Sequence, residues 1–259
     1  MTQSERQMFL IKELLREQPQ YSGVTIPSDG SGRKKLLRSL FNIRAPKPVS
    51  EEFISVQDEY LRGEIASRGI TDADKLTPLQ DNICLWQGDI TTLKCGAIVN
   101  AANSQMLGCF CPCHGCIDNA IHTFSGIQLR LECAEIMRCQ GHEEPVGKAK
   151  ITAAYNLPCE RIIHTVGPYV EGALTREHCA RLKSCYEECL KTAAQNGASS
   201  IAFCCISTGE FNFPNDRAAE IAVETVKEYI KKTKSKMRVI FNVFKNTDKE
   251  IYQRLLAAD

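Results

Sequence analysis

Two patterns of hydrophobic and polar positions divide the chain near residue 82. Before that point apolar residues recur at spacings of three and four, the period of an amphipathic helix. Helices are therefore predicted in FLIKELLREQ, KKLLRSLFNIR and SEEFISVQDEYLRGEIASRG. Ser50 is the predicted N-cap of the third, because Glu51 and Glu52 follow it. We call residues 1–82 the N-terminal extension. We expect it to pack on the rest of the chain, because three short helices alone can barely bury their apolar stripes.

From residue 83, short β-rich runs alternate with helical patterns. The runs are NICLWQ, AIVN, KAKITAAY, RIIHTVG, SIAFCCIS and MRVIFNVF, and the helical patterns span 117–138, 178–196, 215–232 and 247–257. Strands that alternate with crossover helices are typical of a mostly parallel sheet covered on both faces. In such sheets ligands bind beyond the carboxyl ends of the strands. Function is therefore expected in the loops GDITT, NAANS through residue 116, and STGEFNFP.

Composition narrows the class of protein. The 259 residues are 43% apolar and 24% charged, as in an ordinary globular protein of one large domain, or of one domain with an appendage. Lys plus Arg number 32 against 31 for Asp plus Glu, so a nucleic-acid partner is not favoured. The sequence contains no run of 18 apolar residues, so no membrane span is predicted. The first residues also lack the apolar core of a signal peptide, and we therefore expect a cytoplasmic protein. Most of the 14 cysteines lie in apolar contexts typical of buried thiols, and disulfides are not expected.

Four cysteines and one histidine are concentrated in GCFCPCHGC, residues 108–116, which we call the cysteine-rich loop. Thiolates and imidazoles at short spacing are the ligands that Zn²⁺ prefers, and free cysteines in an exposed loop are otherwise prone to oxidation. Haem attachment through C-x-x-C-H is excluded because Phe110 stands where a cysteine is needed. An iron–sulfur cluster remains possible on cysteine count, and so does a loop whose cysteines are incidental small residues.

Other loops carry candidate ligand-binding groups, each with a structural alternative. Asp89 follows a strand, where its carboxylate could accept from an exocyclic adenine amine or simply cap the turn. The turn STGEFNFPND runs into a helix and offers backbone N–H groups to an anion such as a diphosphate. Phe213 could pack on a ribose or base, or belong to the core. Asp118 stands in the first turn of a helix, where a carboxylate is favourable in any case.

The segment GDITTLKCGAIVNAAN resembles the start of the macrodomain, the ADP-ribose-binding fold, and DNAIH, RIIHTVGP and ISTGEFNFP resemble its later segments in the same order. The cysteine-rich loop, with LLRSLFNIR and VQDEYL upstream, is similar to the zinc-containing branch found beside sirtuin-type ADP-ribosyltransferases in microbes. The resemblance implies a three-layer αβα fold at 83–259, with a mixed, mostly parallel sheet, after the N-terminal extension. It also implies removal of ADP-ribose from protein side chains, with ADP-ribose and mono-ADP-ribosylated protein as partners.

The same resemblance assigns roles to single residues. One Zn²⁺ per chain would be held by Cys109, His114 and Cys116, with Cys111 and Cys113 as spectators. Three protein ligands leave a position open, as in catalytic zinc sites, whereas a fourth would indicate a structural site. Asp118 would be the catalytic base, and Asn103 would bind the proximal ribose. The predicted substrate-binding residues are Asp89, Ile90, Asn103, Ser207, Thr208, Gly209, Glu210, Phe211 and Phe213.

Three further features complete the predictions. Asn212 stands where related macrodomains usually have a glycine, and Asn tolerates the left-handed backbone better than most residues. His122 and His164 lie in apolar patterns and are interpreted as core histidines with satisfied hydrogen bonds. The leading hypothesis is a zinc-dependent hydrolase acting on an ADP-ribose ester of Asp or Glu. The alternative is a reader that binds ADP-ribose without turnover and carries a structural zinc.

Overall fold

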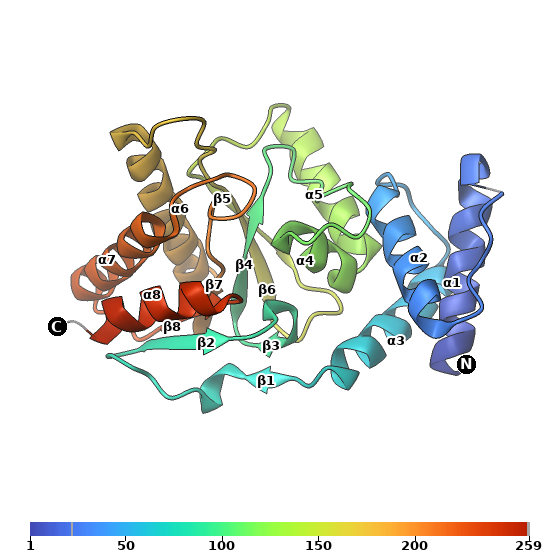
Figure 1. The fold of residues 1–259 in the computed structure, drawn as a ribbon, viewed down its shortest axis with the longest axis horizontal. Helices are drawn as coiled ribbons and strands as arrows, with labels where there is room; N and C mark the ends of the chain where they lie inside the picture. The colour runs from blue at the N-terminus through green and yellow to red at the C-terminus, as the bar shows by residue number, and fades with distance from the viewer. Residues whose placement is uncertain (22, 258–259) are drawn as a thin grey trace.

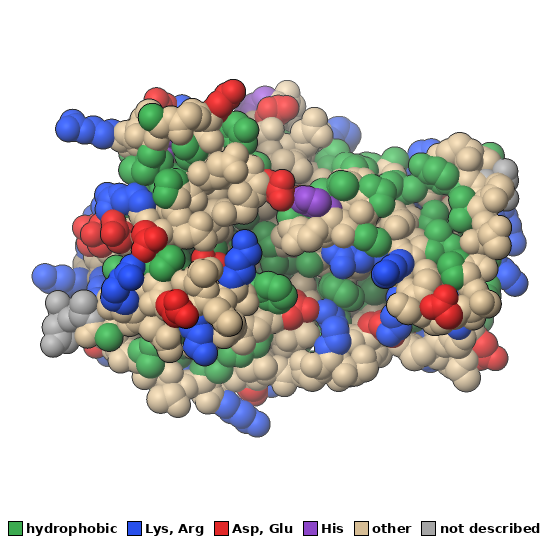
Figure 2. All heavy atoms as spheres, viewed as in Figure 1, with side chains coloured by type: hydrophobic (Ala, Val, Ile, Leu, Met, Phe, Trp, Pro, Cys, Tyr) green, Lys and Arg blue, Asp and Glu red, His purple; other side chains and the backbone are tan. Residues whose placement is uncertain are grey.

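The computed structural model describes residues 1–21 and 23–257. The N-terminal extension contains α1 (Gln3–Glu17), α2 (Gly30–Ile43) and α3 (Glu51–Ser67), as the apolar spacing predicts. Ser50 is the N-cap of α3, and its side chain accepts from the backbone N–H of Phe53. Short 3-10 turns lie at Pro19–Tyr21, Ala73–Lys75 and Ile90–Thr92. The three helices lie together at one end of the molecule (Figure 1), which appears as a lobe in the space-filling view (Figure 2).

The rest of the chain is built on a six-stranded sheet in the order β2-β8-β7-β4-β6-β5. Every neighbouring pair is parallel except β5 and β6. The strands are β2 (Ile83–Gln87), β4 (Ala97–Ala102), β5 (Ala149–Ala153), β6 (Arg161–Val166), β7 (Ser200–Phe203) and β8 (Arg238–Val243). A separate two-residue pair, β1 (Thr71–Asp72) with β3 (Leu93–Lys94), was not predicted; runs this short carry no readable alternation.

Helices cover both faces of this sheet (Figure 1). One side carries α4 (Ile117–Ser125) and α5 (Ile127–Gln140), which lie between the sheet and the extension. The other side carries α6 (Arg176–Gln195), α7 (Asn215–Thr233) and α8 (Asn246–Ala257). The predicted three-layer, mostly parallel α/β fold is therefore confirmed. The single helical stretch expected at 117–138 is wrong in one respect: Gly126 has φ +101 and separates two helices.

Two hydrophobic clusters fill the molecule. The larger lies on both sides of the sheet and includes buried cysteines such as Cys133, Cys185 and Cys189, which behave as small apolar residues. The smaller is formed by α1, α2 and α3 together with Ile127 of α5, and Phe124 of α4 packs against both clusters. Helix α4 is thus shared between the extension and the sheet. Within the described residues, no helix is long and apolar enough to cross a membrane.

Candidate active site

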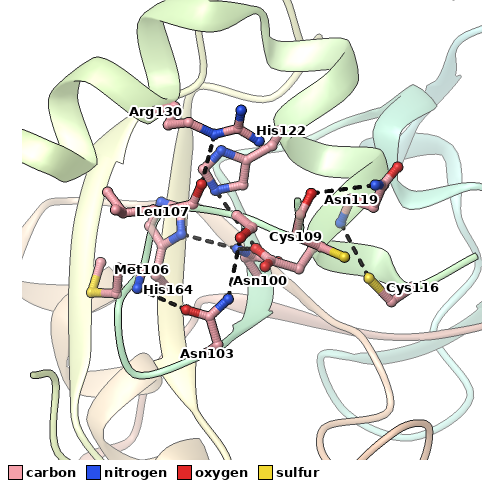
Figure 3. Close-up of polar contacts among 12 residues, drawn as sticks. Asn100, Asn103, Met106, Leu107, Cys109, Cys116, Asn119, His122, Arg130 and His164 are labelled. Carbon is pink, nitrogen blue, oxygen red and sulfur yellow. Dashed lines mark hydrogen bonds and ion pairs between the residues drawn. The ribbon is translucent and has the colours of Figure 1, made fainter. Parts of the chain in front are cut away.

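The cysteine-rich loop brings three potential metal ligands together. Donor atoms of Cys109, His114 and Cys116 all lie within 4.8 Å of one another, and Cys109 Sγ is 3.6 Å from His114 Nδ1. Two ligands at ordinary Zn–S and Zn–N bond lengths on a tetrahedral ion would lie about 3.6 Å apart. Cys116 is also the N-cap of α4, where its Sγ accepts from the backbone N–H of Asn119. In Figure 3, dashed lines join Asn119 to the carbonyl of Cys109 and to the sulfur of Cys116. The donor set and its spacing therefore fit a zinc ion.

Cys111 and Cys113 lie outside this group. Both are exposed, and Cys113 Sγ instead lies 3.4 Å from Lys35 O and 3.3 Å from Ser39 Oγ of helix α2. Within residues 1–21 and 23–257, no fourth Cys, His, Asp or Glu joins the three-residue group. The loop thus offers three protein ligands, which is the number typical of catalytic zinc sites.

Asp118 lies two residues beyond the last of these ligands and is 5% exposed. Its Oδ1 accepts from Asn100 Nδ2 at 2.8 Å, and His122 Nε2 lies 3.6 Å away. Burial raises the pKa of Asp118 to about 6, against the opposing effects of the Asn100 hydrogen bond and the nearby Arg130. A carboxylate with a pKa this close to neutrality is well suited to accept a proton.

Asn100 belongs to a buried polar chain that begins at Asp118. Its amide nitrogen is 3.1 Å from His164 Nδ1 (Figure 3) and 2.8 Å from Asp118 Oδ1. His164 Nε2 is in turn 2.9 Å from Thr152 Oγ1. Asn100 and His164 are cross-strand partners in β4 and β6, which explains why their side chains meet. Sequence reasoning did not single out Asn100. The available signal was an amide in the otherwise apolar strand AIVN.

His122 is a core residue, as expected, but it is not satisfied. Its side chain is 2% exposed, and neither ring nitrogen has a hydrogen-bond partner among the described residues. The prediction of a core histidine with hydrogen-bonded ring nitrogens is therefore wrong for His122. The described residues around the ring, which include Gly108, place no partner within bonding distance. His164 does have partners, and burial lowers its pKa to about 3.

Asn103 shapes the start of the cysteine-rich loop. Its Oδ1 accepts from the backbone N–H groups of Gln105 and Met106 at 3.0 and 3.1 Å, and its Nδ2 donates to Gly108 O at 3.2 Å. These are the bonds of a turn-forming Asn. Among residues 1–21 and 23–257, Nδ2 makes this one donor contact.

The predicted adenine-binding residues lie at the end of β2. Asp89 Oδ1 accepts from the N–H and hydroxyl of Thr91, which is the turn-capping arrangement, and Oδ2 is 2.6 Å from Arg68 Nη1. The guanidinium of Arg68 in turn lies 3.7 Å from the ring centre of Phe124. Ile90 is 1% exposed, so only its backbone could face a ligand. Arg68 was missed by sequence reasoning because it comes from the extension and meets Asp89 only in the fold.

The 207–213 loop follows β7 and faces the cysteine-rich loop. Ser207 and Asn212 have φ +65 and +54, so the chain turns through left-handed conformations at both. A Cβ at Gly209 would meet no atom within 4 Å, which leaves open space beside the backbone. Glu210 Oε1 lies 3.5 Å from His114 Nε2. The loop expected to hold substrate therefore also reaches a predicted metal ligand.

The remaining residues of this loop divide between surface and core. Thr208 donates through its hydroxyl to Cys205 O, which stabilises the turn. Phe211 is half-buried and forms an edge-on pair with the exposed Tyr169, at 5.9 Å between ring centres. Phe213 is 1% exposed and belongs to the main core. The structure thus matches the core alternative for Phe213 and does not place its side chain on a ligand surface. Tyr169 was not predicted, although it lies only two residues beyond the β6 segment RIIHTVG.

The chain is similar to known proteins in both sequence and fold. The Macro domain family matches residues 99–222. A protein-ADP-ribose hydrolase of Treponema medium is 55% identical over 99% of this chain and 100% of its own length, and one of Staphylococcus aureus is 49% identical over 97% and 95%. Among solved structures, an Oceanobacillus iheyensis macrodomain with ADP is 34% identical with a TM-score of 0.62, covering 70% of this chain and 94% of that one. A Trypanosoma brucei macrodomain in complex with ADP-ribose is 26% identical with a TM-score of 0.66, covering 84% and 94%.

Proposed function

The chain belongs to the Macro domain family, and we propose that it is a zinc-dependent hydrolase that removes ADP-ribose from modified protein side chains. The observation that carries this proposal is the proximity in sequence and structure of a three-ligand group to a buried carboxylate at the start of α4. Relatives that match almost the whole chain are named protein-ADP-ribose hydrolases. A reader of ADP-ribose needs neither an open metal position nor a base beside it.

Cys109, His114 and Cys116 would hold the zinc ion, because their donor atoms have the chemistry and the spacing that the ion requires. When bound, zinc supplies Lewis acidity and brings the pKa of a coordinated water towards about 7. Burial raises the pKa of the Cys116 thiol to about 12, and the neighbouring Cys109 adds to this effect. A positive ion would offset the cost of ionising these thiols.

We assign the proton-accepting step to Asp118. The bond to be hydrolysed joins the anomeric carbon of the ribose to a side-chain carboxylate oxygen, which is a reasonable leaving group. Asp118 takes a proton from the attacking water, and Asn100 holds the carboxylate in place through the 2.8 Å hydrogen bond. The proposal specifies a linkage to Asp or Glu. The leaving group is then a carboxylate, which departs without protonation by a strong acid.

The substrate would lie along the carboxyl edge of the sheet. Asp89 would accept from the adenine amine, the 207–213 loop would bind the diphosphate through backbone N–H groups, and Asn103 would hold the proximal ribose. The binding energy of these distant groups positions the reacting bond. The modified protein would be supplied by an ADP-ribosyltransferase, and a sirtuin-type enzyme is the proposed partner.

Metal analysis combined with turnover tests this function. The purified protein should contain about one zinc per chain and release ADP-ribose from a protein mono-ADP-ribosylated on Asp or Glu. Chelation should abolish release, and added Zn²⁺ should restore it. Binding of ADP-ribose without release, in protein that contains zinc, would replace the hydrolase with a reader. Undiminished release after complete removal of the metal would contradict zinc dependence.

A further inference from the structure

Helix α2 of the N-terminal extension contacts the cysteine-rich loop at the main chain of one predicted ligand. Arg38 Nη2 donates to His114 O at 2.9 Å. The same guanidinium donates through Nε and Nη2 to Asn119 Oδ1, at 3.1 and 2.7 Å. Asn119 then donates to Cys111 O at 2.9 Å and to Cys109 O at 3.4 Å. One arginine of the extension thus fixes the loop directly at residue 114 and, through Asn119, near residues 109 and 111.

A second residue of α2 fixes the tip of the loop. Asn42 is 1% exposed, and its Oδ1 accepts from the backbone N–H of Cys113 at 2.9 Å. Its Nδ2 donates to Thr123 Oγ1 of α4 at 2.9 Å. Cys113 has φ +53, which an ordinary residue adopts only when its surroundings require it. The contact of the Cys113 thiol with α2 and this hydrogen bond together account for that conformation.

The start of the loop is connected to the same helix through an arginine of α5. Arg130 of α5 donates through Nε to Leu107 O at 2.7 Å. Its Nη1 donates to Phe41 O and Arg44 O at the end of α2. The Arg130 guanidinium also lies 4.3 Å from the ring centre of Phe110. The start of the loop and its tip are therefore both connected to α2.

The loop has little packing of its own that could replace these bonds. Within 108–116, residues 110–113 and 115 are exposed, and two of the nine residues are glycines. A metal site requires its donor atoms within a few tenths of an ångström of the right geometry, and a flexible loop must lose conformational entropy to provide it. Bonds from a preformed helix reduce that loss before the ion arrives.

We infer that α2 is a positioning element of the metal site, with Arg38 and Asn42 as positioning residues for the cysteine-rich loop. This inference rests on the proposed function, because it assumes that the loop binds zinc. It gives the N-terminal extension a part in catalysis. Each acts on the main chain of the loop, Arg38 at the carbonyl of His114 and Asn42 at the N–H of Cys113.

The test compares matched variants of the full chain. Arg38→Met and Asn42→Ala should each weaken zinc binding by about 10- to 100-fold and lower kcat of the fully loaded protein, with KM changed less than about twofold. Arg33→Met is the control for Arg38: it removes the same charge from the same helix, and Arg33 contacts Gln7 and Ser28 O inside the extension. Thr123→Val is the control for Asn42, because it removes the Nδ2 partner and leaves the bond to Cys113 intact.

Zinc affinity, measured by competition with a chelator, is read beside the melting temperature of each metal-free variant. A structural role alone would lower the melting temperature of variants and controls alike and leave zinc affinity unchanged. The inference is overturned if Arg38→Met and Asn42→Ala bind zinc as tightly as wild type, or if Arg33→Met loses as much affinity as Arg38→Met. If wild type itself binds no zinc at the loop, the proposed zinc-dependent hydrolase fails instead.

Discussion

Replacing Asp118 by Asn should abolish most of the activity and at the same time stabilise the metal-free fold at neutral pH. The carboxyl is 5% exposed and its only hydrogen bond among the described residues comes from Asn100. An Asn oxygen can accept the same bond, so the local structure should persist. The rate should fall by about 10²-fold or more, the usual scale for losing a general base.

The stability gain follows from the pKa of Asp118. Burial raises it from an ordinary 3.8 to about 6, and the difference corresponds to a cost of about 3 kcal/mol for keeping the carboxylate ionised in the fold. Because the pKa is raised on folding, the stability that the protonated group contributes is complete below 3.8. It is lost as pH rises through about 6. The uncharged Asn escapes this loss.

Urea unfolding of the chelated proteins measures the effect. Asp118→Asn should exceed wild type by about 1 to 3 kcal/mol near pH 8, and the gain should shrink towards zero near about pH 4. Asp81→Asn, which removes an exposed carboxyl in a turn, is the control and should show no such pH dependence. Equal stability of Asp118→Asn and wild type at every pH, or a gain that does not depend on pH, would refute the reasoning.

Four other outcomes are expected. Asp89→Ala should weaken ADP-ribose binding by about 1 to 3 kcal/mol in calorimetry and leave zinc bound; equal affinity would reject the adenine role. A chain beginning near Pro78 should melt at lower temperature than the full chain, because it exposes the part of the smaller cluster that α4 and α5 supply; an unchanged melting temperature would count against this. The ring of His164 should stay neutral from about pH 8 to about pH 5 in NMR titration, because burial lowers its pKa to about 3, and titration near 6.5 would contradict this. Ala variants of the three proposed ligands, Cys109, His114 and Cys116, should lose zinc and activity together. Ser variants of the two proposed spectators, Cys111 and Cys113, should keep both.

The sequence predicted what depends on local pattern and failed where two distant segments meet. The strands and helices follow from apolar spacing, and the cysteine-rich loop stands out because its potential donors lie within eight consecutive positions. The ion pair of Arg68 with Asp89 joins residues 21 positions apart, and the bonds of Arg38 reach across 76 and 81. No periodicity encodes such contacts, because they depend on how the extension docks.

The contacts of buried polar residues also could not be predicted from the sequence. Asn100 and His164 look like ordinary members of apolar strands, and only the register of β4 with β6 places them opposite each other. Phe213 was ambiguous because a turn aromatic can face either solvent or core; its burial is decided by packing against the sheet. The unpartnered nitrogens of His122 could not be foreseen, since the lack of an acceptor is a property of several elements together.

The first turn of α4 carries both halves of the proposed chemistry. Cys116 caps the helix, Asp118 is the proposed base, and Asn119 donates to the carbonyls of the proposed ligand Cys109 and of Cys111. Thermal displacement of α4 as a rigid body therefore moves base and metal loop together, and the distance between them varies little. The 207–213 loop follows a different element, β7. A shift of this loop would break the contact of Glu210 with His114, whereas the spacing between the proposed base and Cys116 is set within α4.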